Sequence, residues 1–344
     1  MEPVKYALVG TGNISRTYLT ACSKVAEAEI VAVVSRSMER AEKCAADNNI
    51  GCAAQSLGGI SVPYEAVMLA TPNGLHHRDT IQAAGLSKHV LTEKPLDVTL
   101  ENMDRMIKVC RGAGVLLGVS YQRRMSPGNI AVKKLLEAGA LGKVYAADLA
   151  VKFYRPQAYY DSAEWRGTLA VDGGGPFIQQ ASHNVDTMAW FFGLPEKILA
   201  KTALLAHSGI EVEDHGVAVL TYGDGMLATI IASTVTAPGY PVRLEIHTEK
   251  GSIIMVNDEI VDWDVRGVPE PETRVAETIH SGAGADGAAV TDTSGHEAII
   301  RDFSRCVREG GTPAVSGEEG RKTGLLIDTI YRSAREGREV SLKG

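Results

Sequence analysis

The sequence has few cysteines, no long apolar run and no block of basic residues, and each absence removes a class of protein. Its five cysteines are scattered and nowhere form a Cys-x-x-Cys pair. Such usage argues against a disulfide framework or a thiolate zinc site and fits a reducing compartment. No segment approaches the roughly 18 apolar residues of a membrane-spanning helix. With a net charge of −7, nucleic acids and anionic membranes are poor candidates as partners.

The opening segment, MEPVKYALVG, leads almost directly into a strand-like run and lacks the charged and apolar regions of a secretory signal. We therefore expect a cytoplasmic protein. His76 and His77 are adjacent, but no His-x-x-x-His helix accompanies them, so we expect no metal site. The chain has the composition of an ordinary globular protein, 44% hydrophobic and 22% charged, and its 344 residues are typical of two domains.

Strand-like and helix-like segments alternate over residues 1–121. The expected strands are 4–9, 29–34, 66–70, 90–92 and 115–119, and the expected helices are 16–24, 38–47, 76–84 and 100–110. Alternation with short connections is typical of a parallel sheet covered on both faces. We predict an α/β domain of the Rossmann type, doubly wound, over residues 1–121.

The pattern changes over residues 122–344, where strand-like runs follow one another. The expected strands are 143–153, 198–205, 217–222, 227–233, 243–247 and 252–256. The expected helices are 130–138, 183–192, 297–308 and 318–335, with irregular segments at 155–175 and 269–293. Consecutive strands joined by short turns predict a second, α+β domain that is built on a largely antiparallel open sheet.

A glycine-rich loop, Gly10-Thr11-Gly12-Asn13-Ile14-Ser15, joins the first strand to the first helix. The first glycine permits a tight turn, and the second lets the backbone approach a pyrophosphate at the helix N-terminus. Ser15 is small enough for the close helix–strand packing of the third position. We predict dinucleotide binding by Gly10, Gly12, Asn13 and Ile14, with a plain strand–helix turn as the alternative.

The end of the second strand selects the cofactor. An acid there would bind the ribose hydroxyls of NAD, but the chain has Ser35, Arg36 and Ser37, with Arg40 one helical turn later. Hydroxyls and a guanidinium suit a 2′-phosphate. We predict NADP(H), with NAD(H) as the alternative, in which case Arg36 would be a solvated arginine stacking on adenine.

Three motifs and two longer segments are similar to those of the Gfo/Idh/MocA family, which includes glucose–fructose oxidoreductase and inositol dehydrogenase. These are GTG at 10–12, ATPNGLH at 70–76, KHVLTEKPL at 88–96, QRRMSP at 122–127, and DGGGPFIQQASHNVDTMAWFFG at 172–193. The resemblance covers nearly the whole chain. It implies a cofactor side formed by Thr71, Pro72, Asn73, His76, Glu93, Lys94 and Gln122. It also implies a homodimer or homotetramer that forms through the C-terminal sheet.

The resemblance places Lys94 beside the nicotinamide and the substrate, and His183 against the substrate as a general base. The chemistry agrees, because oxidation of a secondary alcohol needs a group that accepts the hydroxyl proton. A neutral imidazole near pH 7 is apt for that task. The alternatives are a structural lysine that ends a strand and a core histidine with a backbone partner.

Many cyclitol dehydrogenases of this family have an aspartate where this chain has Gln179. A glutamine is not a base, so the difference weakens inositol as the substrate and leaves Gln179 as a binding residue. The segment 155–175 resembles a subgroup that acts on sugars or nucleotide sugars. Tyr160, Trp165 and Arg166 offer aromatic faces, a hydroxyl and a cation to such a substrate, with packing as the alternative for Trp165.

Together these patterns predict an NAD(P)-dependent oxidoreductase that moves a hydride between the nicotinamide and a secondary hydroxyl or ketone of a sugar, nucleotide sugar or cyclitol. Two alternatives stay open at this point. One is a glycosidase-type enzyme with tightly bound NAD that is recycled internally. The other is a dinucleotide-binding sensor without catalysis, against which the presence of both Lys94 and His183 argues.

Overall fold

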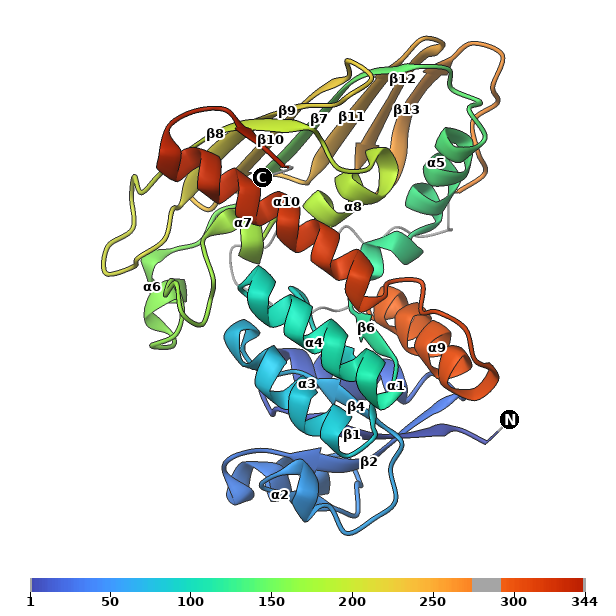
Figure 1. Cartoon of the computed structure of the whole chain (residues 1–344), viewed down its shortest axis with the longest axis vertical. Coiled ribbons are helices and arrows are strands. Elements are labelled where there is room, and N and C mark those ends of the chain that lie inside the picture. Colours follow the sequence, from blue (N-terminus) through green and yellow to red (C-terminus); the bar gives the residue numbers. More distant parts are fainter. Residues whose placement is uncertain (1, 274–291, 343–344) are drawn as a thin grey trace. The chain divides into compact units, whose positions relative to one another are not determined.

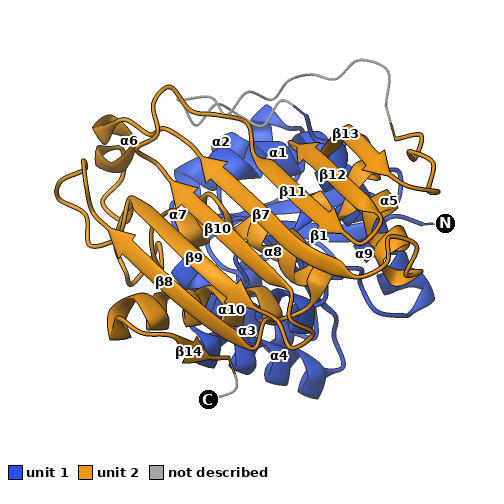
Figure 2. Cartoon of the chain, turned by 90° about the horizontal axis from the view of Figure 1, so that it is seen from above, with its two compact units in different colours: residues 1–122, 289–321 blue, residues 123–288, 322–344 orange. Residues whose placement is uncertain are grey.

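The computed structural model describes residues 2–273 and 292–342, which form two compact units. Unit 1 contains residues 1–122 and 289–321, and unit 2 contains residues 123–288 and 322–344 (Figure 2). The predicted domain boundary at residue 121 did not anticipate the return of 289–321 to the first unit. Most of the segment predicted as a loop, residues 269–293, lies outside the described residues. No helix in the described part is both long and apolar enough to cross a membrane.

Unit 1 is built on a six-stranded sheet in the order β3-β2-β1-β4-β5-β6, in which all neighbours are parallel. Its strands are β1 Val4–Val9, β2 Ala28–Val34, β3 Ala53–Ala54, β4 Ala66–Leu69, β5 His89–Thr92 and β6 Leu117–Val119. Its helices are α1 Asn13–Cys22, α2 Met38–Asp47, α3 His76–Gly85, α4 Leu100–Ala113 and α9 Ser294–Glu309, with short 3₁₀ turns η1 Leu57–Gly59 and η2 Asn73–Leu75. The central strand β4 is buried along its whole length, as expected of a strand covered on both faces. The predicted Rossmann sheet is confirmed.

Helix α9 comes from the C-terminal part of the chain but packs against α1, β1 and β2 of unit 1 (Figure 1). Tyr6 and Ser304 form a buried hydroxyl–hydroxyl hydrogen bond of 2.7 Å. Gly118 on β6 makes room for the ring of Phe303, because a Cβ at Gly118 would lie 2.7 Å from that ring. The tight fit explains why α9 belongs to the first unit despite its distance in sequence.

Unit 2 contains an eight-stranded sheet in the order β13-β12-β11-β7-β10-β9-β8-β14. Its strands are β7 Val144–Lys152, β8 Lys197–Ala203, β9 His215–Thr221, β10 Leu227–Ser233, β11 Arg243–Thr248, β12 Gly251–Val256, β13 Glu259–Val265 and β14 Val340–Ser341. Only the pair β7–β10 is parallel among these strand pairs, so the predicted largely antiparallel sheet is confirmed.

The helices of unit 2 cover one face of this sheet. They are α5 Pro127–Glu137, α6 Gln157–Asp161, α7 Pro176–Gln179, α8 Ser182–Phe192 and the later part of α10 Gly317–Glu336, and η3 Gln122–Met125 spans the boundary between the units. Phe177, Val185, Met188 and Ile330 belong to the apolar core beneath the strands. Figure 2 shows the opposite face of the sheet, on which no helix from the described residues of unit 2 lies.

The uncovered face carries apolar side chains at alternate strand positions. Burial along β9 alternates, with Val217 and Val219 exposed between buried neighbours. Val219 pairs in register with the exposed Leu199 of β8. A strand with one buried and one exposed face normally alternates apolar and polar residues, so exposed apolar residues on the outer face depart from the usual pattern.

Candidate functional site

The glycine loop of unit 1 leaves β1 and enters α1. Gly10 has a φ of +107°, and a Cβ there would lie 2.5 Å from the carbonyl oxygen of Ala70. Gly12 is exposed at the N-cap of α1, and a Cβ there would have no neighbour within 4 Å. Gly10 is therefore required by the fold itself, whereas Gly12 leaves open space at a helix N-terminus, where a phosphate group is bound well.

The side chains at the end of β2 are arranged around the start of α2. Ser37 caps α2 by accepting a hydrogen bond from the backbone N–H of Arg40 at 3.3 Å. Ser35 accepts one from the backbone N–H of Ser37 at 3.4 Å. The guanidinium groups of Arg36 and Arg40 are exposed, and among the residues that the structure describes neither forms an ion pair.

His76 joins the two loops that follow β4 and β5. Its ring is fully buried, with Nε2 2.9 Å from the carbonyl oxygen of Thr71 and Nδ1 2.9 Å from that of Pro95. Thr71 in turn donates its hydroxyl to Asp79 at 2.9 Å. The buried His76 ring therefore links the loops that follow β4 and β5, which carry predicted cofactor residues. Both loops lie at the carboxyl edge of the sheet, where ligands of such sheets bind.

Lys94 follows β5 and precedes a cis peptide bond to Pro95. Its backbone N–H donates to the Glu93 carboxylate at 3.1 Å, and Glu93 is only 6% exposed. In η3, the Oε1 atom of Gln122 is buried without a hydrogen-bond partner in the described part of the chain. A buried acceptor of this kind, together with the open space at Gly12, fits a bound dinucleotide.

Apart from Lys94, the residues predicted to contact the substrate lie in unit 2, on α7, α8 and the segment before them. A Cβ at Gly175 would lie 1.9 Å from the carbonyl oxygen of Glu213, so only glycine fits at the entrance to α7. The Glu213 carboxyl accepts hydrogen bonds from the Gly175 backbone at 3.0 Å and from the Tyr331 hydroxyl at 2.9 Å. These contacts hold the turn that leads to Gln179 and His183, with His183 in the first turn of α8.

Gln179 is coupled to a carboxylate that our sequence analysis missed. Its side-chain nitrogen donates to the backbone carbonyl of Asp172 at 2.7 Å and also to the Asp172 carboxylate. Asp172 is 3% exposed and accepts a hydrogen bond from the backbone N–H of Gly167 at 2.7 Å. The contact orients the Gln179 amide, and no local sequence signal predicted it, because the two residues are seven positions apart in an irregular segment.

Arg166 lies against two aromatic rings. Its guanidinium carbon is 4.2 Å from the centroid of Tyr159 and 4.9 Å from that of Trp165. Its Nε atom is buried without a hydrogen-bond partner among the described residues. Arg155 also contacts the Tyr159 ring, at 5.5 Å. Two cations therefore share one aromatic residue; Nη1 of Arg155 donates to the carbonyl oxygen of Tyr154 at 2.9 Å, whereas the buried Nε of Arg166 could still donate to an anion.

Tyr160 is buried, unlike Trp165 and Arg166, with which it was predicted to contact the substrate. It is 6% exposed, and its hydroxyl is 3.0 Å from that of Thr234. Burial is the main cause that raises the pKa of Tyr160 to about 12. Its ring meets that of His207 edge-on at 4.6 Å. These contacts give Tyr160 a supporting position beneath the segment that carries Tyr159, Trp165 and Arg166.

Two family models match the chain, one for each unit. The model described as "Oxidoreductase family, NAD-binding Rossmann fold" matches residues 4–121. The model described as "GFO/IDH/MocA C-terminal domain" matches residues 130–254. The chain belongs to the Gfo/Idh/MocA family.

Solved structures and characterised proteins of similar sequence support the same assignment. The WlbA dehydrogenase from Bordetella pertussis, in complex with NADH and UDP-GlcNAcA, is 33% identical with a TM-score of 0.85, and the match covers 98% of each chain. The 1,5-anhydro-D-fructose reductase of Ensifer adhaerens is 26% identical over 94% of this chain and 95% of its own. A scyllo-inositol 2-dehydrogenase (NADP(+)) of Bacillus subtilis is 26% identical over 81% of this chain and 79% of its own.

This Gfo/Idh/MocA protein is an NAD(P)-dependent oxidoreductase. It transfers a hydride between the nicotinamide and a secondary hydroxyl or ketone of a sugar, nucleotide sugar or cyclitol, as the sequence analysis predicted. The three relatives above are dehydrogenases or reductases, and none supports the glycosidase or the sensor that we kept as alternatives.

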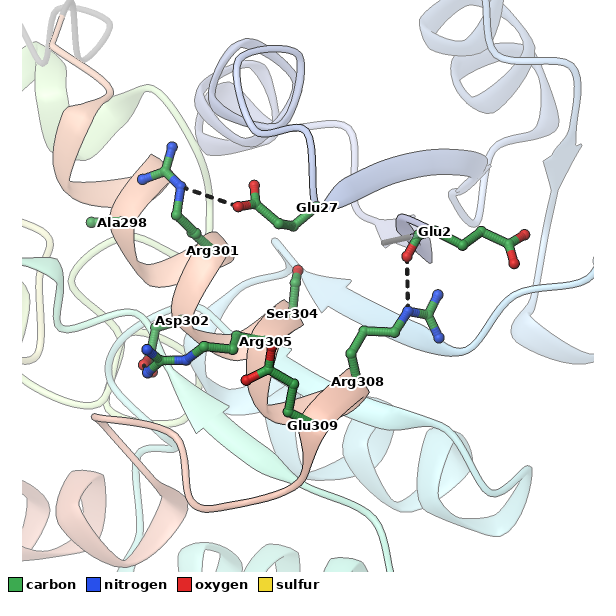
Figure 3. Close-up of a pocket in the computed structure, with 9 residues that line it drawn as sticks. All are labelled: Glu2, Glu27, Ala298, Arg301, Asp302, Ser304, Arg305, Arg308 and Glu309. Atoms are coloured by element: carbon green, nitrogen blue, oxygen red, sulfur yellow. Dashed lines mark hydrogen bonds and ion pairs between the residues drawn. The ribbon is translucent and has the colours of Figure 1, made fainter.

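One surface depression in unit 1 lies apart from these residues. It has a volume of about 370 Å³ and is lined mainly by charged side chains of α9, with Glu2 and Glu27 from the segments just before β1 and β2 (Figure 3). Its arginines already have carboxylate partners, since Arg301 is 3.7 Å from Glu27 and Arg305 is 2.8 Å from Asp302. Arg308 donates hydrogen bonds to the Glu65 carboxylate and to the backbone carbonyl oxygen of Glu2. A depression with internally balanced charges does not attract an ionic ligand, so we assign none to it.

Proposed function

We propose that the enzyme oxidises a ring hydroxyl of a nucleotide-activated sugar that carries an acidic group. The observation that carries this proposal is Arg166, whose guanidinium stacks on Tyr159 and Trp165 while its buried Nε has no acceptor among the described residues. Such a group lacks only an anion, and a substrate carboxylate or diphosphate oxygen would supply it. The UDP-GlcNAcA complex of the 33% identical relative offers both kinds of anion and supports this substrate class.

In the proposed reaction the substrate carbon loses a hydride and its hydroxyl loses a proton, which leaves a ketone. The nicotinamide, when bound, accepts the hydride. Lys94 binds the substrate oxygen and His183 accepts the proton, because a neutral imidazole is a suitable base near pH 7. Gln179, which is oriented by Asp172, binds a neighbouring hydroxyl. Trp165 packs against the sugar ring, whereas the buried Tyr160 supports the segment that carries Trp165.

The preference for NADP(H) over NAD(H) is part of the proposal. Arg36 and Arg40 are exposed at the end of β2, and no acid stands at Ser35, Arg36 or Ser37. A 2′-phosphate would receive charge-assisted hydrogen bonds from Arg36 and hydrogen bonds from the serine hydroxyls. One relative is named for NADP(+), and another is described with NADH, so the relatives leave the choice to these residues.

We further propose that the uncovered face of the unit 2 sheet binds a second copy of the chain. Leu199, Val219 and Leu227 are 43%, 41% and 53% exposed. They lie on the adjacent strands β8, β9 and β10, and a cluster of exposed apolar side chains is often covered by a partner. A homodimer or homotetramer covers it.

The test compares substrates and variants with both cofactors. Initial rates would be measured with UDP-GlcNAcA, with the uncharged UDP-N-acetylglucosamine, and with myo-inositol. We expect the acidic nucleotide sugar to have the highest kcat/KM. Arg166→Ala should raise the KM for UDP-GlcNAcA by about 10–100-fold, as for a lost charge-assisted hydrogen bond.

Arg111→Ala is the matched control, because Arg111 lies on α4 and is paired with Glu318 at 2.9 Å. It should leave all rates unchanged. Lys94→Ala should abolish turnover with every substrate. A higher kcat/KM for myo-inositol than for UDP-GlcNAcA, or an equal effect of Arg166→Ala on all substrates, would contradict the proposed substrate class.

A further inference from the structure

A buried carboxylate stands directly behind Lys94. Glu93 is 6% exposed, and its Oε2 atom accepts the backbone N–H of Lys94 at 3.1 Å. Its own backbone N–H donates to Leu69 of β4 at 2.9 Å, which ties it to the sheet. The Glu93 side chain therefore controls both the backbone position of Lys94 and the charge next to it.

The other oxygen of Glu93 faces a histidine from the far end of the sequence. Nε2 of His296, in the first turn of α9, is 3.4 Å from Oε1 of Glu93, and His296 is 2% exposed. Neither atom has a closer hydrogen-bond partner among the described residues. Their 3.4 Å separation falls short of good hydrogen-bond geometry, but burial excludes water from both atoms, so the attraction between them is only weakly screened.

The imidazole is fixed by packing and by the anchoring of α9. The Tyr18 ring meets that of His296 edge-on at 5.6 Å, and the Tyr18 hydroxyl is 2.5 Å from that of Ser120. Lys24 pairs with Glu297 at 3.1 Å and thereby holds the next residue of α9. The ring consequently has little freedom to turn away from Glu93.

The surroundings keep Glu93 ionised. Burial acts to raise the pKa of the Glu93 carboxyl, but the His296 imidazole, the Lys94 ammonium and the Tyr18 hydroxyl outweigh burial and hold that pKa below its usual value. A buried carboxylate without such partners would instead take up a proton. Within this cluster, His296 is the group that comes from the C-terminal part of the chain, on α9.

We propose that His296 is a positioning residue for hydride transfer, acting on Lys94 through the Glu93 carboxylate. The imidazole holds Oε1 so that Oε2 stays on the Lys94 backbone and the negative charge stays beside the ammonium. This inference rests on the proposed catalytic role of Lys94. It assigns to α9, outside every motif of the family resemblance, a direct influence on the reacting group.

The test uses His296→Leu, which removes the donor, and His296→Gln, whose amide nitrogen can still donate to Glu93. We expect His296→Leu to lower kcat by about 10–100-fold, the usual effect of losing the support of a reacting group, with each KM within about twofold of wild type. His296→Gln should restore kcat to within about threefold. His89→Gln is the control, since His89 lies at the opposite end of β5 and its Nδ1 accepts a hydrogen bond from Leu116.

A second readout does not depend on turnover. The rate at which an amine-directed reagent modifies Lys94 in the full-length protein, followed by peptide mass spectrometry, should rise in His296→Leu and stay at the wild-type value in His296→Gln and His89→Gln. Wild-type kcat and labelling in His296→Leu would overturn the inference and leave the role of Lys94 intact. The inference would also be overturned if His296→Leu and His296→Gln lost kcat to the same extent and Tm to the same extent. Such a result would indicate a purely structural residue. Full activity of Lys94→Ala would overturn the proposed role of Lys94 and the inference with it.

Discussion

Arg124 and Asp186 form a buried, two-point ion pair beneath the helix that carries His183. Nε of Arg124 is 2.7 Å from Oδ2 of Asp186, and Nη2 of Arg124 is 2.8 Å from Oδ1 of Asp186. Asp186 is fully buried and Arg124 is 4% exposed. Thr323 of α10 donates its hydroxyl to Asp186 at 2.7 Å. The pair joins the segment after the first domain to α8, three residues from His183, and fixes the helix from below.

Breaking this pair should destabilise the protein strongly. We expect Arg124→Met and Asp186→Asn each to lower the free energy of unfolding by about 3–5 kcal/mol, because each leaves a buried partner without its complement. The double variant Arg124→Met/Asp186→Leu should cost less than the sum of the single changes. Urea denaturation followed by circular dichroism measures all three. Losses below about 1 kcal/mol in both single variants would show that the pair is not a structural anchor.

The two glycines of the first loop should respond differently to the same change. Gly10→Ala should destabilise the fold by about 2 kcal/mol or more, because of the positive φ and the contact with Ala70. Gly12→Ala should unfold like wild type, since a Cβ has open space there, yet bind the dinucleotide at least about tenfold more weakly. Thermal unfolding and calorimetric titration separate the two effects. Undiminished binding by Gly12→Ala would remove Gly12 from the proposed site.

The proposed NADP(H) preference depends on Arg36. Arg36→Ala should weaken NADPH binding by about 10–100-fold and leave NADH binding within about twofold, because only the 2′-phosphate contact is lost. Lys43→Ala serves as the control, because it also removes one positive charge, but from α2. Lys43 pairs there with Asp47 at 3.3 Å. Fluorescence titration with both reduced cofactors measures the affinities. Equal losses for NADPH and NADH, or a wild-type preference for NADH, would reject this interpretation of Arg36.

Glu213 should make stability depend on pH. Burial is the main cause that raises its pKa to about 7 from the ordinary value of 4.5, although the Tyr331 hydroxyl and backbone N–H groups act to lower it. The folded state therefore holds the proton more tightly than the unfolded chain. The resulting stabilisation is complete below pH 4.5 and is lost as the pH rises through about 7.

Glu213→Gln should remove this loss, which amounts to about 3 kcal/mol across that interval at about 1.4 kcal/mol per pKa unit. Denaturation of both proteins at several pH values between 4 and 8 gives the difference in the free energy of unfolding. A difference that stays constant across this range would show that Glu213 does not titrate as described.

The sheet face of unit 2 provides a test of assembly. Val219→Glu should convert a dimer or tetramer into a monomer with an unchanged fold, because it places a charge in the centre of the proposed apolar interface. Leu86→Glu alters a residue in unit 1 that is 40% exposed and should leave the assembly intact. Analytical ultracentrifugation gives the masses. A monomeric wild-type protein would exclude the proposed interface.

Local pattern alone predicted most of the elements. The strand β10 and the helix α2 begin and end where the hydrophobic periodicity predicted, since alternation and helical spacing are local properties of the chain. Strand β13 was missed because Asp262 and Asp264 interrupt its apolar alternation at the edge of the sheet. Five residues of the segment predicted to be irregular form α6, too short a helix to leave a periodic signal.

The sequence by itself determined the two-domain organisation, the parallel and antiparallel sheets, and the residue types that we propose to bind a dinucleotide and a hydroxyl substrate. These follow from periodicity, turn chemistry and motifs that span a few residues. Only the tertiary structure decided that α9 returns to the first unit, that His296 faces Glu93, and that Asp172 orients Gln179. The physical reason is that such contacts arise from packing, because a buried polar atom takes whichever partner the fold brings to it, and Glu93 and His296 are about two hundred positions apart.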